Sequence, residues 1–366
     1  ASSTKKNMDT SENDEDSIIS NAKNVSTSLV DYLDKTNKYD ITLVLEKKQG
    51  ILLNSLNKNI RLIEYSPSYN RIFGKILNAI KRIKFTIKYK NKFDASFAYA
   101  TYCKMAAFTT QVASKNSNLW VHSSYLDIFD GNEIKYKQFF KEINVDNFRN
   151  IIFVSNKSKV QFEKVLNKNN TIVCNNIINY KKIKELSKEK IQETKPEEFA
   201  FLYVGRIVEE SKKISRLLEA SKELKERGMD FKVFVVGDGK DLEKSKKYVN
   251  DNNLNKYVEF LGTRINPYSY YKISNALILV SENEGYPVVY NEAKVLDLPI
   301  LTTDVSDSKL DIDNKYGIVC KQNVNDIVEK MEFFIKNGFY IKEKFEPQKY
   351  NEEIIKKVED IIDERN

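Results

Sequence analysis

Short apolar runs alternate with amphipathic helical segments along most of the chain, and this alternation restricts the possible folds more than any other feature. In the first half, the runs with the length and composition of buried strands cover residues 39–45, 60–65, 94–99, 118–122, 151–155 and 171–175. Repeated βα units of this kind predict a parallel sheet covered by helices. We therefore expect an α/β protein.

The alternation breaks once and then restarts. Residues 181–198 are highly charged and lack strand signals, which indicates a linker. Apolar runs at 199–204, 231–236, 257–261 and 276–280 then begin a second unit. Because 366 residues exceed one typical domain, we predict two Rossmann-like, doubly wound domains facing each other across a cleft, at residues 21–180 and 199–345. The polar, acidic residues 1–20 are expected to be irregular or disordered, and the helix at 346–366 to cross back to the first domain.

The composition narrows the possible partners, the cellular compartment and the kinds of site. The 60 Lys and Arg residues against 52 Asp and Glu give a net charge of +8, which fits an anionic partner such as a nucleotide, a nucleic acid or a membrane surface. Three scattered cysteines without a CxxC pair favour a reducing cytosol, and a single histidine excludes a His-rich metal site. No run approaches the ~18 apolar residues of a membrane span, and the first residues are too polar for a signal peptide.

The stretch EGYPVVYNEAKVLDLPIL, residues 284–301, carries most of the predicted chemistry. It follows an apolar run, and Pro287 lies where a helix would begin, because its fixed φ and missing N–H suit a first helical turn. A helix N-terminus can bind phosphate, while Glu284 and Glu292 can accept hydrogen bonds from hydroxyls. The combination predicts a nucleotide-sugar site. The alternative is that both glutamates are ordinary surface carboxylates.

A cationic loop follows the apolar run 199–204. Gly205 and Arg206 come directly after this run, and Lys212 follows a short polar loop. Because ligands of open α/β sheets bind at the carboxyl ends of strands, these cations are placed to neutralise a diphosphate leaving group. Solvated surface charges are the alternative.

A glycine turn, Gly237-Asp238-Gly239, ends the apolar run 231–236. It does not match the GxGxxG dinucleotide fingerprint, because Leu242 occupies the third glycine position. The turn indicates either close approach of the backbone to a ligand or a plain turn.

Residues 71–93 contain eight basic residues and no acidic residue. Their apolar residues, at 72, 73, 76, 77, 80, 83 and 87, form one stripe on a helix. Such a helix can lie on an anionic membrane, and the expected lipid contacts are Lys75, Lys81, Arg82, Lys84 and Lys88. Alternatively, the stripe packs on the sheet of its own domain and the charges face water. Nucleic-acid binding is least favoured, because the segment has helical spacing and few aromatic positions for base stacking.

Four segments in order, LYVGRIVEESKKISRLLEA, VFVVGDG, YVEFLGT and EGYPVVYNEA, resemble the retaining GT-B-fold glycosyltransferase family 4. WVHSSY and VSNKSK resemble its bacterial polysaccharide and lipid-linked glycan branch. The resemblance covers the second domain and most of the first. It implies a metal-independent, retaining hexosyltransferase that moves a sugar from a UDP-linked donor to a lipid-linked or glycan acceptor, without a further cofactor, at the cytoplasmic face of the cell membrane.

The resemblance also implies roles for individual residues. The catalytic group would be His122, Arg206, Lys212 and Glu284, and the donor would contact Gly205, Gly237, Gly239, Arg264, Ile265, Gly285, Tyr286, Pro287, Val288 and Glu292. Two departures stand out: Lys213 replaces a usual glycine, and Ser20-Asn21-Ala22 replaces a Gly-Gly-Ala turn that normally follows an opening strand. The second departure leaves open a non-catalytic member that binds and stabilises an active partner.

Overall fold

The structure is a computed structural model, and it describes residues 28–48, 56–70 and 72–363. The predictions for residues 1–20 and for Ser20-Asn21-Ala22 lie outside these ranges. Residues 28–35 are helical, and the elements of the first domain are β1 (Thr42–Leu45), β2 (Arg61–Glu64), α2 (Gly74–Tyr89), β3 (Ala95–Ala98), α3 (Lys104–Ala113), β4 (Asn116–Val121), α4 (Tyr125–Ile128), α5 (Glu133–Glu142), η2 (Val145–Asn147), β5 (Asn150–Phe153), α6 (Asn156–Leu166) and β6 (Thr171–Val173).

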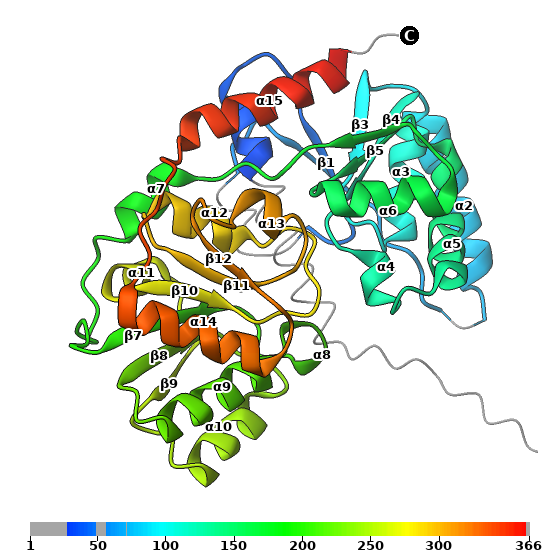
Figure 1. Cartoon of the computed structure of the whole chain (residues 1–366). Helices are drawn as coiled ribbons and strands as arrows, with labels where there is room; N and C mark the ends of the chain where they lie inside the picture. The colour runs from blue at the N-terminus through cyan, green and yellow to red at the C-terminus, as the bar shows by residue number, and fades with distance from the viewer. Residues whose placement is uncertain (1–27, 49–55, 71, 364–366) are drawn as a thin grey trace, which may run out of the picture.

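The first domain contains only parallel pairings among its described strands (Figure 1). β1 pairs with β2, and the strands β3, β4, β5 and β6 pair in sequence order in a second sheet. All six strands fall within or next to the apolar runs of the sequence. The expected α/β class is confirmed.

The second half of the chain folds around a six-stranded parallel sheet of order β12-β11-β10-β7-β8-β9. Its elements are α7 (Tyr180–Leu186), β7 (Phe199–Val204), α8 (Glu209–Lys212), α9 (Ile214–Glu226), β8 (Phe231–Val236), α10 (Leu242–Asp251), β9 (Val258–Gly262), α11 (Tyr268–Ile273), β10 (Ala276–Leu279), α12 (Val288–Val295), β11 (Ile300–Thr303), α13 (Ser308–Asp311), β12 (Gly317–Cys320), α14 (Val324–Asn337) and α15 (Pro347–Asp363). The strand order reverses between β7 and β10. In such sheets, ligands bind outside the carboxyl ends of the strands at this reversal.

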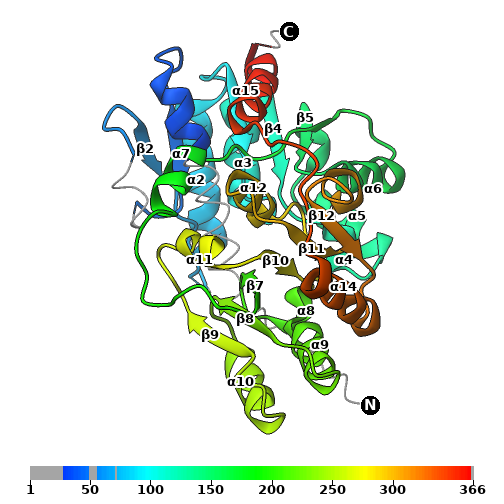
Figure 2. The same ribbon diagram turned by 60° about the vertical axis from the view of Figure 1, so that its left-hand side comes forward.

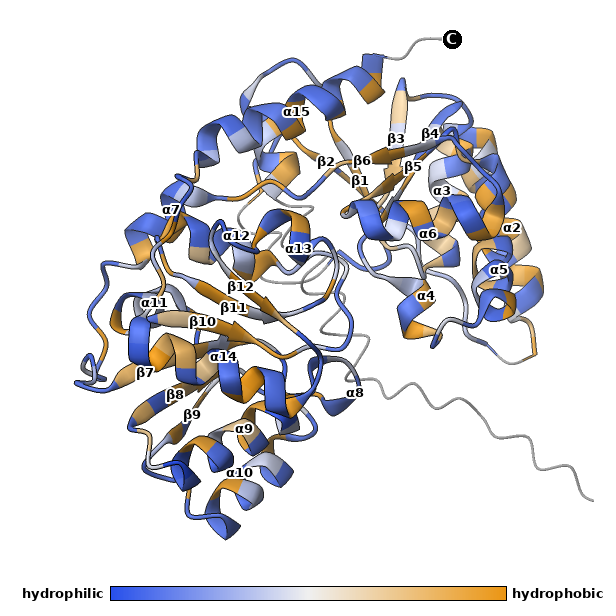
Figure 3. Cartoon of the chain, viewed as in Figure 1, coloured by the Kyte–Doolittle hydropathy of each residue, from blue (hydrophilic) through white to orange (hydrophobic). Residues whose placement is uncertain are grey.

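Alternating side chains of β7 build two cores, one on each face of the sheet. Phe201 and Tyr203 pack with α9 and α14, whereas Ala200 and Leu202 pack with α11 and α12. Successive strand residues point to opposite faces, so a strand covered on both sides is mostly apolar, as Figure 3 shows for β10. The doubly wound arrangement follows directly.

The predicted linker is partly helical. α7 lies across its beginning, and Ile183 of α7 is buried in the core of the second domain. The high charge of residues 181–198 hid this short amphipathic helix, because one buried isoleucine in a lysine-rich run gives a weak periodic signal. The segment between the domains therefore begins by packing on the second domain.

The C-terminal helix α15 packs on the first domain (Figure 1 and Figure 2). Its apolar side chains share a core with Trp120 of β4 and Ile152 of β5. The side-chain amide of Asn116 also donates to the carbonyl of Ile361 at 2.6 Å. The chain thus crosses back after completing the second sheet. In the described part of the chain, no helix has both the length and the apolar character to cross a bilayer.

Candidate active site

The loop after β10 and the loop after β7 meet through an ion pair. The ammonium of Lys212 pairs with the carboxylate of Glu284, and the hydroxyl of Ser281 donates to the same carboxylate at 2.8 Å. Both charged side chains are mostly buried. Two of the cationic and acidic residues predicted from sequence therefore lie together at the reversal point of the sheet.

A second ion pair fixes these two loops to each other. Arg216 of α9 pairs with Glu282 and also donates to the carbonyl of Val280 at 3.2 Å. The backbone N–H of Glu282 donates to the carbonyl of Ser211 at 2.8 Å. The Lys212–Glu284 pair is thus held by an independent scaffold.

Arg206 lies at the same end of β7. Its carbonyl accepts a hydrogen bond from the buried Tyr203 hydroxyl at 2.8 Å. Burial raises the pKa of Tyr203, the negative charge of Glu284 raises it further, and the guanidinium of Arg206 opposes both. The charges of both Arg206 and Glu284 therefore act on the Tyr203 phenol.

The glycine turn after β8 contacts protein backbone. A Cβ on Gly237, whose φ is +146°, would lie 1.9 Å from the carbonyl oxygen of Gly205, and one on Gly239 would lie 2.3 Å from that of Ile207. Only glycine fits at either position. The turn therefore sets the path of the loop that carries Arg206, and this packing accounts for both glycines without a ligand.

Lys213, which replaces the family's usual glycine, has left-handed backbone with φ of +49°. That conformation costs a side-chain-bearing residue roughly 1 kcal/mol. We expect Lys213→Gly to raise the free energy of unfolding by up to ~1 kcal/mol. Part of this gain is offset, because glycine has a larger conformational entropy in the unfolded chain. Denaturant unfolding measures the change. Lys222→Gly, in the interior of α9, is the control and should lower the same quantity by about 1 kcal/mol; a similar loss for both variants would contradict the explanation.

Glu292 lies on α12 and is bound by two tyrosines. The hydroxyls of Tyr268 and Tyr271 donate to its two carboxylate oxygens at 3.2 and 2.8 Å. Burial raises the pKa of Glu292, and these two hydrogen bonds oppose the rise. The sequence analysis missed both tyrosines, although their spacing of three on one helix indicates a shared face.

The two domains touch where the loop after β10 meets the end of β4. A Cβ on Gly285 would lie 2.0 Å from the carbonyl oxygen of His122. The His122 ring stacks with Trp120 and Tyr99, at centroid distances of 5.9 and 5.6 Å. Its Nε2 is buried and has no hydrogen-bond partner among the described residues. The structure therefore brings His122 of the first domain beside the glutamate loop of the second.

Burial lowers the pKa of His122 to about 4, so the imidazole is neutral near pH 7. The unfolded chain binds this proton at higher pH, near 6.5. The stability contributed by neutral His122 is therefore complete above pH 6.5 and is lost as pH falls towards 4. We expect the difference in unfolding free energy between wild type and His122→Phe to change by on the order of 3 kcal/mol from pH 7 to pH 4. Denaturant titrations at several pH values test this, and a constant difference would contradict it.

Asp307 forms another contact between the domains. Its carboxylate accepts hydrogen bonds from the backbone N–H groups of Asn156 and Lys157, at 2.6 and 2.9 Å. These N–H groups belong to the first turn of α6, where a negative charge is favourable. No local sequence pattern indicated this contact, because the partners are about 150 residues apart.

Tyr286 and α12 are anchored by a buried network. Lys294, 2% exposed, contacts both oxygens of Asp311 at 2.6 Å, and the Tyr286 hydroxyl donates to the same carboxylate. The Lys294 ammonium also lies 4.7 Å from the ring centroid of Tyr316. The hydroxyl of Tyr286, a predicted donor contact, fixes the loop against α13.

The remaining predicted donor contacts lie at the start of α12 and in the loop after β9. Pro287 is the N-cap of α12, which carries no side-chain cap, and Val288 is the partly exposed first residue of the helix. Arg264 pairs with Glu193 at 3.2 Å, and the neighbouring Ile265 is fully exposed.

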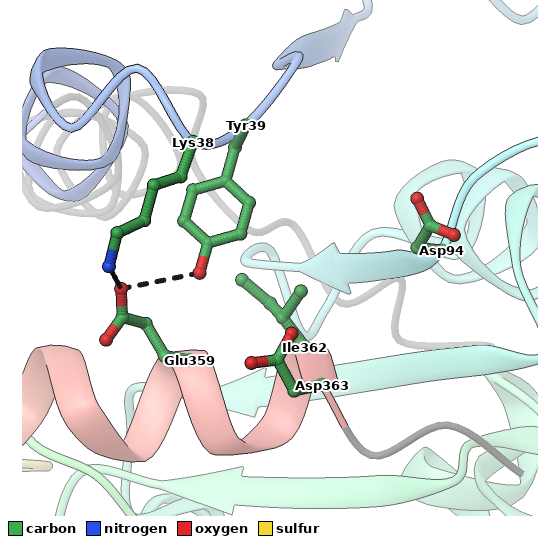
Figure 4. A pocket seen from close by; sticks show the side chains of 6 residues that line it. All are labelled: Lys38, Tyr39, Asp94, Glu359, Ile362 and Asp363. Atoms are coloured by element: carbon green, nitrogen blue, oxygen red, sulfur yellow. Dashed lines mark hydrogen bonds and ion pairs between the residues drawn. The ribbon is translucent and has the colours of Figure 1, made fainter.

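A pocket of about 370 Å³ lies elsewhere, where α15 meets the first domain (Figure 4). Lys38 lines this pocket, and its ammonium group pairs with the carboxylate of Glu359 at 3.0 Å. Because the other charged groups lining it are acidic, it does not suit a phosphate. No group of three His, Cys, Asp or Glu side chains in the described ranges could hold a metal ion. The pocket is lined by Lys38, Tyr39, Asp94, Glu359, Ile362 and Asp363.

Residues 182–359 match the family model of glycosyl transferases group 1. Just under half of the chain is therefore similar to the group 1 glycosyltransferases. An uncharacterized glycosyltransferase of Methanocaldococcus jannaschii is 26% identical over 273 residues, covering 71% of this chain and 65% of its own. A capsular polysaccharide biosynthesis glycosyltransferase of Staphylococcus aureus is 26% identical over 211 residues, which cover 56% of this chain and 55% of the relative. The matches thus span less than two thirds of these relatives.

The likeness to solved glycosyltransferases extends over both domains. The Anabaena protein HepE, solved in complex with UDP, superposes with a TM-score of 0.72 over 93% of this chain and 96% of its own, at 14% identity. At this identity the likeness concerns the fold. The expected GT-B arrangement of two Rossmann-like domains is confirmed.

Proposed function

We propose that this protein is a group 1 glycosyltransferase that moves a sugar from a UDP-linked donor to a lipid-linked or glycan acceptor, with retention of configuration, in bacterial surface polysaccharide synthesis. The observation that carries the proposal is the Lys212–Glu284 pair at the reversal of the second sheet. A cation and a carboxylate at this place suit the two ends of a sugar diphosphate. The proposed setting is the inner face of the cell membrane.

The proposed chemistry follows from the charges. On donor binding, Lys212 exchanges Glu284 for the diphosphate, and the sugar hydroxyls then donate to the freed carboxylate. Arg206 and the uncapped N-terminus of α12 share the leaving-group charge, so the mechanism needs no metal ion or cofactor. Glu292 binds the ribose, and neutral His122 lies beside the anomeric carbon.

The bond changes balance without a protein nucleophile. The acceptor oxygen bonds to the anomeric carbon on the face from which the diphosphate departs, and the acceptor proton passes to a diphosphate oxygen. Two neighbours support the choice of donor and setting: HepE was solved with UDP and with UDP-glucose, and the Staphylococcus aureus relative acts in capsular polysaccharide biosynthesis.

Thermal unfolding of the purified chain with a panel of nucleotides and nucleotide sugars tests the proposal. A ligand that binds only the folded protein raises the unfolding midpoint, so UDP and one or more UDP-sugars should raise it above the values with GDP or UMP. No shift with any nucleoside diphosphate would refute the proposal. Binding without transfer or donor hydrolysis would instead favour a non-catalytic subunit.

A further inference from the structure

The apolar stripe of α2 faces solvent. The stripe has seven large side chains, two just before the helix and five on it, and they are between 41% and 80% exposed. Only Gly74 and Phe85 of the helix are buried. A helix that covers a sheet normally buries its apolar stripe, so the arrangement here is reversed. The alternative, in which the stripe packs on the sheet of its own domain, is therefore wrong. The exposed residues are Ile72, Phe73, Ile76, Leu77, Ile80, Ile83 and Ile87.

The opposite face of α2 attaches the helix to the domain. Phe85 packs against the rings of Tyr65 and Phe108, at 5.2 and 6.1 Å between centroids. The Lys81 ammonium donates to the carbonyl of Ser66 at 2.7 Å, and the Arg82 guanidinium lies 4.9 Å from the Phe108 centroid. Lys81 and Arg82, both expected at the lipid surface, therefore contribute to holding the helix in place.

The other predicted basic contacts are exposed beside the stripe. At 100° per residue, Lys84 and Lys88 lie along one border of the stripe and Lys75 lies beyond the other. Residues 71–93 contain no acidic side chain that could neutralise them. Figure 1 places α2 on the outer side of the first domain. The surface therefore combines contiguous apolar side chains with positive charge.

We propose that this face of α2 docks on an anionic lipid bilayer, with the stripe in the headgroup boundary and Lys75, Lys84 and Lys88 at lipid phosphates. Pairing with a second copy would bring two uncompensated sets of positive charge together, which disfavours association. The inference deepens the proposed function, because docking holds the enzyme where a lipid-linked acceptor lies. Binding to lipid itself does not depend on that function.

Co-sedimentation with phosphatidylcholine vesicles, with and without phosphatidylglycerol, tests the inference using the full chain. Wild type should bind only the anionic vesicles. Lys75→Gln/Lys84→Gln/Lys88→Gln should weaken binding roughly 100-fold, at about 1 kcal/mol per lysine near the surface. The control Lys244→Gln/Lys246→Gln/Lys247→Gln removes equal charge from α10 of the second domain and should bind like wild type.

A second triple variant, Ile76→Ser/Ile80→Ser/Ile83→Ser, tests the apolar contribution. It should lose anionic vesicle binding while keeping the unfolding midpoint and its shift with UDP, because these side chains are exposed in the free protein. The proposal would be overturned if wild type failed to bind the anionic vesicles, or if the α10 control weakened binding as much as the α2 variant. It would also be overturned if the serine variant kept vesicle binding and instead lost a dimer formed by wild type. Vesicle binding in a protein that shows no shift with any nucleotide would reject the proposed function alone.

Discussion

Lys212→Ala and Glu284→Ala are each expected to reduce the turnover of sugar transfer by ~10² or more. Removing one group that stabilises transition-state charge in a largely buried site has an effect of this size. Lys212 would lose its hold on the departing diphosphate, and Glu284 its hydrogen bonds to the donor sugar. Steady-state transfer from the UDP-sugar that gives the largest thermal shift measures the effect.

The exposed pair Lys222–Glu226 on α9 is the matched control. Its side chains are 43% and 62% exposed, and its N–O distance is 4.0 Å. Lys222→Ala and Glu226→Ala remove the same chemical groups outside the site, so turnover should stay close to wild type. Near-wild-type turnover in the Lys212 and Glu284 variants as well would mean that the pair has no part in the reaction.

Asp311→Ala is expected to lower the free energy of unfolding by about 3 kcal/mol or more. The substitution leaves the Lys294 ammonium buried without its carboxylate, and removing one partner of a buried pair typically costs this much. It also removes an acceptor of the Tyr286 hydroxyl. Denaturant unfolding followed by circular dichroism measures the loss.

Two further variants separate the buried charge from a general effect. Asp304→Ala breaks the exposed pair with Lys309 and should cost less than about 1 kcal/mol. Lys294→Met/Asp311→Leu removes both charges and should recover most of the stability lost in Asp311→Ala. If Asp311→Ala and Asp304→Ala were equally mild, the network would not anchor the loop.

Much of the fold was predictable because strands covered on both faces leave continuous apolar runs, as in 199–204 and 231–236. β11 and β12 were not predicted, because their assignment depends on pairing in the folded sheet, where β11 pairs with β10 and β12 pairs with β11. The helical period of α2 was also readable from the sequence. Its orientation was not, because a stripe has the same spacing whether it faces the core or the solvent.

The candidate site was predictable to a similar extent. The strand-end positions of Lys212 and Glu284 indicated neighbouring groups, because β7 and β10 are adjacent and parallel. The partners of Glu292 and the contact of Asp307 with α6 depend on how separate elements pack, which local patterns do not encode. Glycines 237 and 239 were explained by backbone packing that only the folded chain shows.

The central claim is that cations after β7 bind the diphosphate of a nucleotide sugar. Isothermal titration of UDP and of uridine against wild type and Arg206→Ala/Lys212→Ala tests it most directly. UDP affinity should fall at least ~10²-fold in the variant, since each charge-assisted contact contributes on the order of 1.5–3 kcal/mol, while uridine affinity should stay unchanged. Equal UDP affinity in both proteins, or an equal loss for UDP and uridine, would contradict the claim.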